Sequence, residues 1–204
     1  MTHHRVEAPH APVARQPISS PDGRVLGHEY LYRSRVGLAA GVDRWPPARQ
    51  DAASAAVLHT LYGHHAPCGT GLVFVNVTRA FLVGERPLPP ADHRLVLEVV
   101  ESVPADAATL AGLARLRAHG YHVALDDWTA SPAQCAMLRH ADFVKVDCRD
   151  LEHLGEAGLR EARAGGARLV AERVADEQLR AHCVELRFDL LQGYALGRPA
   201  LIGA

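Results

Sequence analysis

The sequence has 204 residues, enough for one well-buried domain, and no low-complexity segment divides it. Its net charge of −1 gives no footprint for DNA or an anionic membrane, and no apolar run approaches the ~18 residues of a membrane span. The amino terminus lacks the hydrophobic segment of a signal peptide, and the four cysteines include no CxxC pair. We therefore expect a cytoplasmic protein with free thiols that binds neither DNA nor membrane.

The amino-terminal part of the chain predicts an antiparallel hairpin behind a disordered tail, residues 1–11. Two strand-like runs, residues 12–19 and 24–34, flank a turn of composition SPDG. Side chains alternate between the two faces of a strand, so Glu29 and Arg33 in the second run are expected to point the same way.

Helical and strand-like segments alternate over the rest of the chain. A loop at residues 37–47 is long enough to act as a lid, and a helical segment at residues 48–62 follows it. A further helix is expected to begin at Ser131-Pro132, an N-cap followed by proline at the first helical position. The later strand-like runs span residues 72–76, 94–99, 121–126, 142–147, 167–172 and 188–191, and the other helical segments lie near residues 78–83, 104–116, 151–164 and 176–186.

This alternation predicts an α/β fold with a mainly parallel sheet, and eight strands within one domain favour closure into a TIM-like (β/α)8 barrel. Residues 12–204 would form that single domain. The chain is at the short end for such a barrel, so some helices or loops must be trimmed. An open, doubly wound sheet is the alternative fold.

The run at residues 121–126 ends in two adjacent carboxylates, Asp126 and Asp127. Such a pair alone is more often turn or cap chemistry, because Asp bonds its own backbone readily. Here, however, six successive runs each carry a polar group near their ends, and the carboxyl ends of barrel strands converge over one mouth. We expect one cavity to receive Asn76, Glu98, Asp126, Asp127, Lys145, Glu172 and Gln192.

Oxygen ligands without Cys or His favour hard divalent cations, Mg²⁺ or Mn²⁺. With Glu29 the cluster holds five carboxylates and one ammonium, a charge that two divalent cations would balance. Two metals about 3.5 to 4 Å apart are the usual device for attack of hydroxide on a phosphodiester. Lys145 could orient the water and Arg33 could hold a substrate phosphate. Lys145 could instead be a buried ion-pair residue or the nucleophile of a Schiff-base enzyme.

Eight short motifs follow one another along the chain: RQPI at 15–18, GHEYLYR at 27–33, NVT at 76–78, LEVVES at 97–102, LDDW at 125–128, VKVD at 144–147, AERV at 171–174 and LLQGYALGRP at 190–199. In this order they resemble the EAL domain of bacterial cyclic di-GMP phosphodiesterases. The resemblance implies a barrel whose first strand runs antiparallel. It also implies metal-dependent hydrolysis of cyclic di-GMP to linear pGpG.

The same resemblance implies a role for each residue that matches a family motif. Some would hold the metals, some would carry catalysis or contact the nucleotide, and others would support the loop after the Asp-Asp pair. The metal ligands would be Glu29, Asn76, Glu98, Asp126 and Asp127; the catalytic residues Lys145, Glu172 and Glu29; the nucleotide contacts Gln16, Arg33 and Gln192; and the loop supports Glu101 and Asp147.

Three features depart from the family pattern. The loop after Asp127 reads WTASPAQ where the family has a longer Phe-Gly-x-Gly-Tyr-Ser-Ser. Arg173 and Ala175 replace the Gly and the second Glu of the late Glu-Gly-Val-Glu. GHEYLYRS also resembles a subgroup in which a degenerate EAL domain is joined to an HDOD domain. The alternative function is therefore a catalytically impaired EAL domain that senses cyclic di-GMP or regulates a protein partner, and a homodimer is also compatible.

Overall fold

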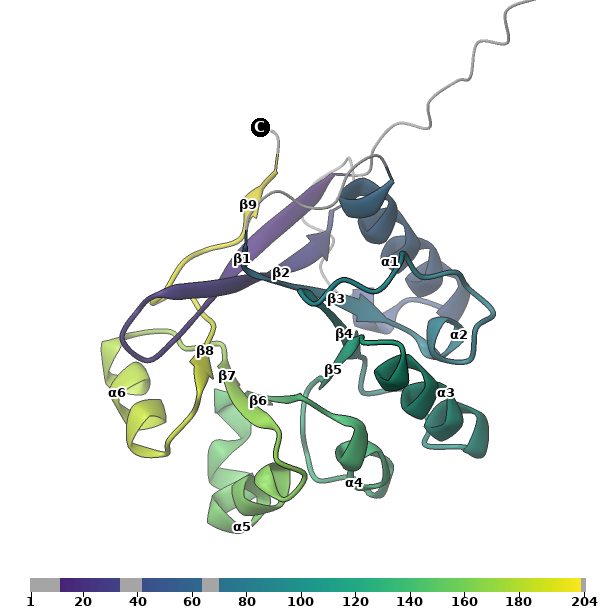
Figure 1. Ribbon diagram of the computed structural model, residues 1–204. Helices are drawn as coiled ribbons and strands as arrows, with labels where there is room; N and C mark the ends of the chain where they lie inside the picture. Colours follow the sequence, from purple (N-terminus) through teal and green to yellow (C-terminus); the bar gives the residue numbers. More distant parts are fainter. Residues whose placement is uncertain (1–11, 34–41, 64–69, 203–204) are drawn as a thin grey trace, which may run out of the picture.

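The computed structural model describes residues 12–33, 42–63 and 70–202, so the predicted tail, residues 37–41 of the predicted lid loop and Cys68 lie outside the described residues. Within them the chain forms a closed barrel of eight strands, with a short ninth strand beside the first (Figure 1). The strands are β1 (Val13–Ser19), β2 (Val25–Tyr32), β3 (Leu72–Val77), β4 (Leu95–Val99), β5 (His122–Leu125), β6 (Phe143–Asp147), β7 (Arg168–Glu172), β8 (Leu190–Leu191) and β9 (Ala200–Leu201).

The direction of β1 distinguishes this barrel from an all-parallel one. Strands β2 to β8 are parallel neighbours in chain order, whereas β1 is antiparallel to β2 and also to β8, where it closes the barrel. The predicted barrel with an antiparallel first strand is confirmed, and the open-sheet alternative is wrong. β9 pairs with β1 at Ala14 and Arg15 and was not predicted.

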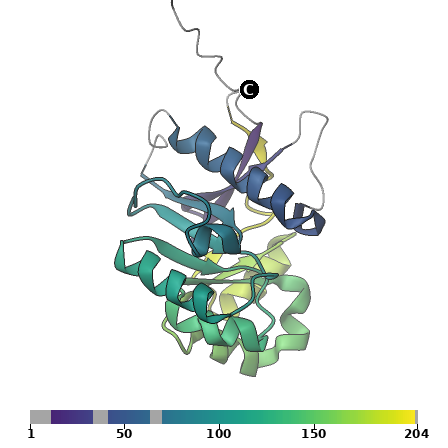
Figure 2. The same ribbon diagram turned by 90° about the vertical axis from the view of Figure 1, so that its right-hand side faces the viewer.

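Helices pack around the outside of the barrel, as the two views in Figures 1 and 2 show. Helix α4 begins with a capping box, in which Ser131 and Gln134 each bond the other's backbone, as expected of an N-cap before proline. Gly155 breaks the regular geometry of α5 with φ 56° and ψ −171°. The helices are α1 (Pro47–Tyr62), α2 (Arg79–Leu82), α3 (Ala107–Ala118), α4 (Pro132–Met137), α5 (Leu151–Arg163) and α6 (Glu177–Glu185), with single 3₁₀ turns η1 (Val42–Arg44), η2 (Leu138–His140) and η3 (Cys148–Asp150).

The barrel interior is built in two layers by the two-residue period of its strands. On β3 to β8, each strand contributes an apolar residue and, two positions later, a polar one. The apolar residues form one buried cluster of Ile18, Phe74, Val96, Ala124, Phe143, Val170 and Leu190. The polar residues that follow are Asn76, Glu98, Asp126, Lys145, Glu172 and Gln192. The apolar layer thus closes the barrel beneath the polar one.

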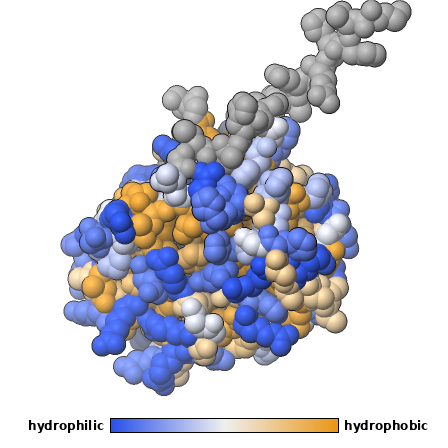
Figure 3. Space-filling model, viewed as in Figure 1, coloured by the Kyte–Doolittle hydropathy of each residue, from blue (hydrophilic) through white to orange (hydrophobic). Residues whose placement is uncertain are grey.

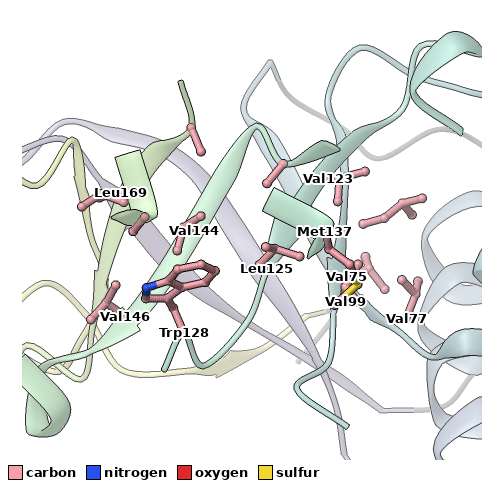
Figure 4. Packing of buried hydrophobic residues seen from close by; sticks show 14 of the residues in the cluster. Val75, Val77, Val99, Val123, Leu125, Trp128, Met137, Val144, Val146 and Leu169 are labelled. Carbon is pink, nitrogen blue, oxygen red and sulfur yellow. The ribbon is translucent and has the colours of Figure 1, made fainter. Parts of the chain in front are cut away.

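A second hydrophobic core lies between the outer faces of the strands and the helices. Figure 4 shows part of it, where Trp128 packs near Val144 and Val146. The β1–β2 hairpin has no helix between its strands, and Val25 on it is 50% exposed. Figure 3 shows the molecule from the same side as Figure 1. The surface on this side is polar over much of its area, with hydrophobic residues gathered at the upper left.

Two further expectations concern cysteines and membrane spans. Cys135, Cys148 and Cys183 are free thiols, as expected. Among the described residues, no helix combines the length and the apolar character needed to cross a membrane.

Candidate active site

A cavity of about 780 Å³ opens at the carboxyl ends of the parallel strands. Most of the residues predicted for the site line it. Glu98 and Asp147 do not, because both are buried behind the wall. The predicted residues that line the cavity are Gln16, Glu29, Arg33, Asn76, Glu101, Asp126, Asp127, Lys145, Glu172 and Gln192.

Lys145 stands at the centre of the polar layer with its side chain 1% exposed. Its Nζ atom lies 2.7 Å from Glu98 Oε1, 2.8 Å from Glu172 Oε1, 3.1 Å from Asp126 Oδ1 and 3.8 Å from Glu29 Oε2. Burial opposes the ammonium charge, but the four carboxylates outweigh it and raise the pKa of Lys145 well above its ordinary value. A lysine held charged in this way is a poor amine nucleophile, so the geometry disfavours a Schiff-base enzyme.

Glu29 on β2 accepts hydrogen bonds from a residue of β3 and from a residue directly after β8. Its Oε2 accepts a hydrogen bond of 2.6 Å from Gln192 Nε2, and its Oε1 accepts one of 3.2 Å from Asn76 Nδ2. Gln192 Nε2 lies 3.3 Å from Gln16 Oε1, and Gln16 Nε2 donates to the carbonyl of Gly197. These bonds connect β1, β2, β3 and β8, so the predicted amide residues are fixed against the central carboxylates.

The pKa values of several acids in the cluster are raised, because these acids are buried close together and away from water. Burial raises the pKa of Glu98 well above its ordinary value. Burial also raises the pKa of Glu172 to about 8, despite the opposing charge of Lys145. Burial and the neighbouring Asp126 raise the pKa of Asp127 to about 6. Near neutral pH the metal-free cluster therefore retains protons that exposed carboxyl groups would release.

The chemistry of the cluster suits hard cations. Five carboxylates face one ammonium, and Glu98 Oε2 and Gln192 Oε1 are buried without a hydrogen-bond partner in the described structure. Such orphaned oxygens fit a divalent cation by charge and by donor type. In the part of the chain that the structure describes, however, no three His, Cys, Asp or Glu side chains are already grouped as a metal-ion site. The carboxylates are instead spread around Lys145.

The loop after the Asp-Asp pair depends on a residue that the sequence analysis missed. The side-chain amide of Gln134 donates to the backbone carbonyls of Asp126 and Asp127. The signal was present in the sequence as the capping-box pattern, a Ser followed three residues later by Gln. That pattern indicates a helix start, but it does not indicate that the same Gln reaches back to the carboxylate pair.

The two predicted loop supports lie in different settings. Asp147 is 2% exposed and pairs with Arg149 and with Arg173 Nε at 2.8 Å, so it connects the end of β6 to the loop after β7. Burial opposes ionisation of Asp147, but its bonds to Arg149 outweigh burial and lower its pKa. Glu101 lines the cavity and is exposed, and within the described structure it makes no hydrogen bond or ion pair. Their roles as loop supports stay predictions.

The sequence of the chain matches a known protein family. The EAL domain model matches residues 82–199, more than half of the chain. The chain belongs to the EAL domain family. This agrees with the motif resemblance and with the barrel described above.

The family model covers residues 82–199, and the similarity to individual relatives covers up to 93% of the chain of this EAL domain. It is 28% identical over 199 residues to the cyclic di-GMP phosphodiesterase CdgJ of Vibrio cholerae, covering 93% of the chain and 44% of CdgJ. It is 28% identical over 149 residues to the cyclic di-GMP phosphodiesterase RocR of Pseudomonas aeruginosa, covering 67% of the chain and 37% of RocR. The chain therefore spans less than half the length of these curated relatives.

Solved structures give the same fold. BlrP1 of Klebsiella pneumoniae in a complex with calcium and cyclic di-GMP superposes with a TM-score of 0.71 and 26% identity, covering 100% of the chain and 59% of BlrP1. Its manganese and cyclic di-GMP complex superposes with a TM-score of 0.72 and 24% identity, covering 97% and 58%. Divalent cations accompany cyclic di-GMP in both complexes.

Proposed function

We propose that this EAL domain hydrolyses cyclic di-GMP to linear pGpG with Mg²⁺ or Mn²⁺. The observation that carries the proposal is the layer of oxygen donors around Lys145 at the mouth of an EAL barrel. Hydrolysis of a phosphodiester needs positive charge on the phosphoryl oxygens and a positioned water, and a carboxylate cluster on a rigid barrel can hold the cations that provide this charge.

Four of the metal ligands in this proposal line the cavity, and the fifth, Glu98, lies buried beside Lys145. A bound divalent cation would act as a Lewis acid on the phosphoryl group and would lower the pKa of water. The orphaned oxygen on Glu98 and the excess of carboxylates over Lys145 support this assignment. The proposed ligands are Glu29, Asn76, Glu98, Asp126 and Asp127.

The remaining polar residues would bind substrate and handle protons. Glu172 has a pKa of about 8, raised by burial, so near neutral pH its carboxyl group can hold or release a proton on the oxygen that does not accept from Lys145. Lys145 would orient the attacking water. Arg33, Gln16 and Gln192 line the same cavity and would contact the nucleotide.

A second candidate is a domain that binds cyclic di-GMP, or a protein partner, without efficient turnover. It is favoured by the pairing of four carboxylates with Lys145 and by the absence of a ready metal-ion group among the described residues. A cytoplasmic location, a homodimer and kinship with the EAL-HDOD subgroup remain part of the proposal and rest on the sequence.

The deciding experiment is incubation of the protein with cyclic di-GMP and Mg²⁺ or Mn²⁺, with products separated by chromatography. We expect pGpG, no product with EDTA, and a loss of at least about 100-fold in Glu29→Ala, because that change removes a proposed ligand and a hydrogen-bond acceptor for Asn76 and Gln192. Glu185→Ala, which alters an exposed Glu on α6, should keep wild-type activity. Binding of intact cyclic di-GMP without pGpG would favour the second candidate.

A further inference from the structure

The side chain of Gln134 holds the backbone of both residues in the Asp-Asp pair. It is 3% exposed in the first turn of α4. Its Nε2 donates to the carbonyl of Asp126 at 3.1 Å and to the carbonyl of Asp127 at 2.9 Å. A primary amide has two N–H donors, so both are spent on the residues that carry the two carboxylates.

The oxygen of the same side chain holds the other half of the loop. Gln134 Oε1 accepts from the backbone N–H groups of Thr129 at 2.9 Å and Ser131 at 3.3 Å. It also lies 3.2 Å from each of their hydroxyl oxygens, which can donate to it. One buried amide therefore connects the first and last parts of the segment from residue 126 to residue 131.

This loop needs such a restraint because its backbone is strained. Asp127 has a φ of 44° and Ala130 a φ of 56°, and neither is glycine. Side chains with a Cβ rarely adopt this left-handed region, and they stay there only where the surroundings fix them. Two main-chain bonds secure the neighbouring residues, from Asp126 N to Val99 O and from Trp128 N to Lys145 O. Neither of these bonds fixes the Asp127 carbonyl.

We infer that Gln134 is a positioning residue that sets the carboxylates of Asp126 and Asp127 for divalent-cation binding. The inference rests on the proposed function, since it deepens the assignment of the Asp-Asp pair as metal ligands. The two amide bonds give the loop after Asp127 a restraint that reaches both residues of the pair.

Gln134 also belongs to the capping box of α4, and the test must separate the two roles. Gln134→Glu keeps an oxygen that can accept from Thr129 and Ser131, and a Glu is favourable in the first turn of a helix. It removes the amide that bonds Asp126 and Asp127. Ser131→Ala is the matched control, because it removes the N-cap hydroxyl and leaves the bonds from Gln134 Nε2 to Asp126 and Asp127 in place.

The experiment is a titration of each metal-free protein with Mn²⁺, followed by electron paramagnetic resonance of the free ion, without nucleotide. We expect Gln134→Glu to weaken Mn²⁺ binding about 10- to 100-fold, the usual effect of losing a residue that orients metal ligands. Gln134→Met, which cannot regain a donor by protonation, should show the same loss. Ser131→Ala should bind Mn²⁺ as the wild type does, although it unfolds at a lower temperature.

The outcomes distinguish this inference from the proposed function. Wild-type affinity in both Gln134 variants, or no Mn²⁺ binding by the wild type, overturns the inference. Equal weakening in Ser131→Ala also overturns it, because the effect would then belong to the helix start. If the wild type binds Mn²⁺, the Gln134 variants bind it more weakly, and cyclic di-GMP remains intact, the inference stands and hydrolysis fails.

Discussion

At the scale of single residues, Lys145 supplies the only cationic group found within 4.0 Å of four carboxylates in the described structure. These carboxylates belong to Glu29, Glu98, Asp126 and Glu172. A buried charge left without its partner is costly, whereas the intact pair adds little over an apolar replacement. The stability of the metal-free protein should therefore depend strongly on this one ammonium group.

We expect Lys145→Met to lower the free energy of unfolding by about 3 to 5 kcal/mol in EDTA, because the buried acids lose their counter-charge. Urea unfolding at pH 7 measures the change. Arg149→Met is the matched control: the Arg149 side chain is 70% exposed, and Arg173 still pairs with Asp147 after the change, so the loss of Arg149 should cost at most about 1 kcal/mol. Equal effects of the two substitutions would show that the carboxylates do not depend on Lys145.

The sequence predicts the central residues better than it predicts their partners. Polar residues at strand ends could be identified because the two-residue period and the barrel bring them to one mouth. The reach of Gln134 to the Asp-Asp carbonyls, and the Arg173 pair with Asp147, depend on how loops fold back, which local pattern does not encode. Glu98 was predicted to face the cavity but lies behind Lys145, because Lys145 is long enough to cover it.

At the scale of elements, the loops after β7 and β8 are held together by close backbone contact. Val174 N donates to Gln192 O, and Ala195 N donates to Val174 O. A Cβ at Gly193 would overlap the backbone N and O atoms of Val174. Only glycine permits this approach, which keeps Gln192 against Glu29.

Gly193→Ala should therefore lower the free energy of unfolding by about 3 kcal/mol, since backbone atoms cannot move aside as a side chain can. Gly120→Ala provides a control for backbone strain without a clash: Gly120 has a φ of 88° and open space around its Cα, and we expect a cost of about 1 kcal/mol. Urea unfolding compares the two. A Gly193 variant no less stable than the Gly120 variant would mean that the loops separate easily.

Element boundaries were predicted where capping and proline signals are strong, and missed where an element is very short. The start of α4 follows from Ser131 and Pro132. β9 has two residues and contains little strand signal of its own. It pairs with Ala14 and Arg15 of β1, whereas β8 pairs with β1 at Ser19. Gly155 did not predict the break in α5, since a single glycine is tolerated in many helices.

At the scale of the whole molecule, the barrel follows from repetition. Each of six successive strands places an apolar residue in the lower layer and a polar residue above it, and this arrangement is consistent only if the strands share one interior. The antiparallel β1 followed from the hairpin turn at residues 20–23, which cannot connect parallel strands. The fold therefore concentrates acids in one place, and this concentration should control how the stability of the metal-free protein varies with pH.

The pH range in which the stability of the metal-free protein changes follows from the pKa of Glu172. Burial raises its pKa from an ordinary 4.5 to about 8, so the folded protein holds a proton that the unfolded chain has released. This stabilisation is complete below about pH 4.5 and is lost as pH rises through about 8. Burial lowers the pKa of His28 and His140 below 6.5, and these residues act with the opposite sign only below that value. Between pH 7 and 8 the carboxyl group of Glu172 should therefore change the stability more than the two histidines do.

We expect the urea midpoint of the wild type in EDTA to fall between pH 7 and pH 8.5, whereas Glu172→Gln should show a clearly flatter profile, because its side chain does not ionise. Glu177→Gln, the same change at an exposed site on α6, should reproduce the wild-type slope. The difference between the wild-type and Glu172→Gln slopes removes contributions common to both proteins, such as those of the cysteines. Parallel profiles would mean that Glu172 is already ionised throughout this range, and its proposed part in proton transfer would then fail as well.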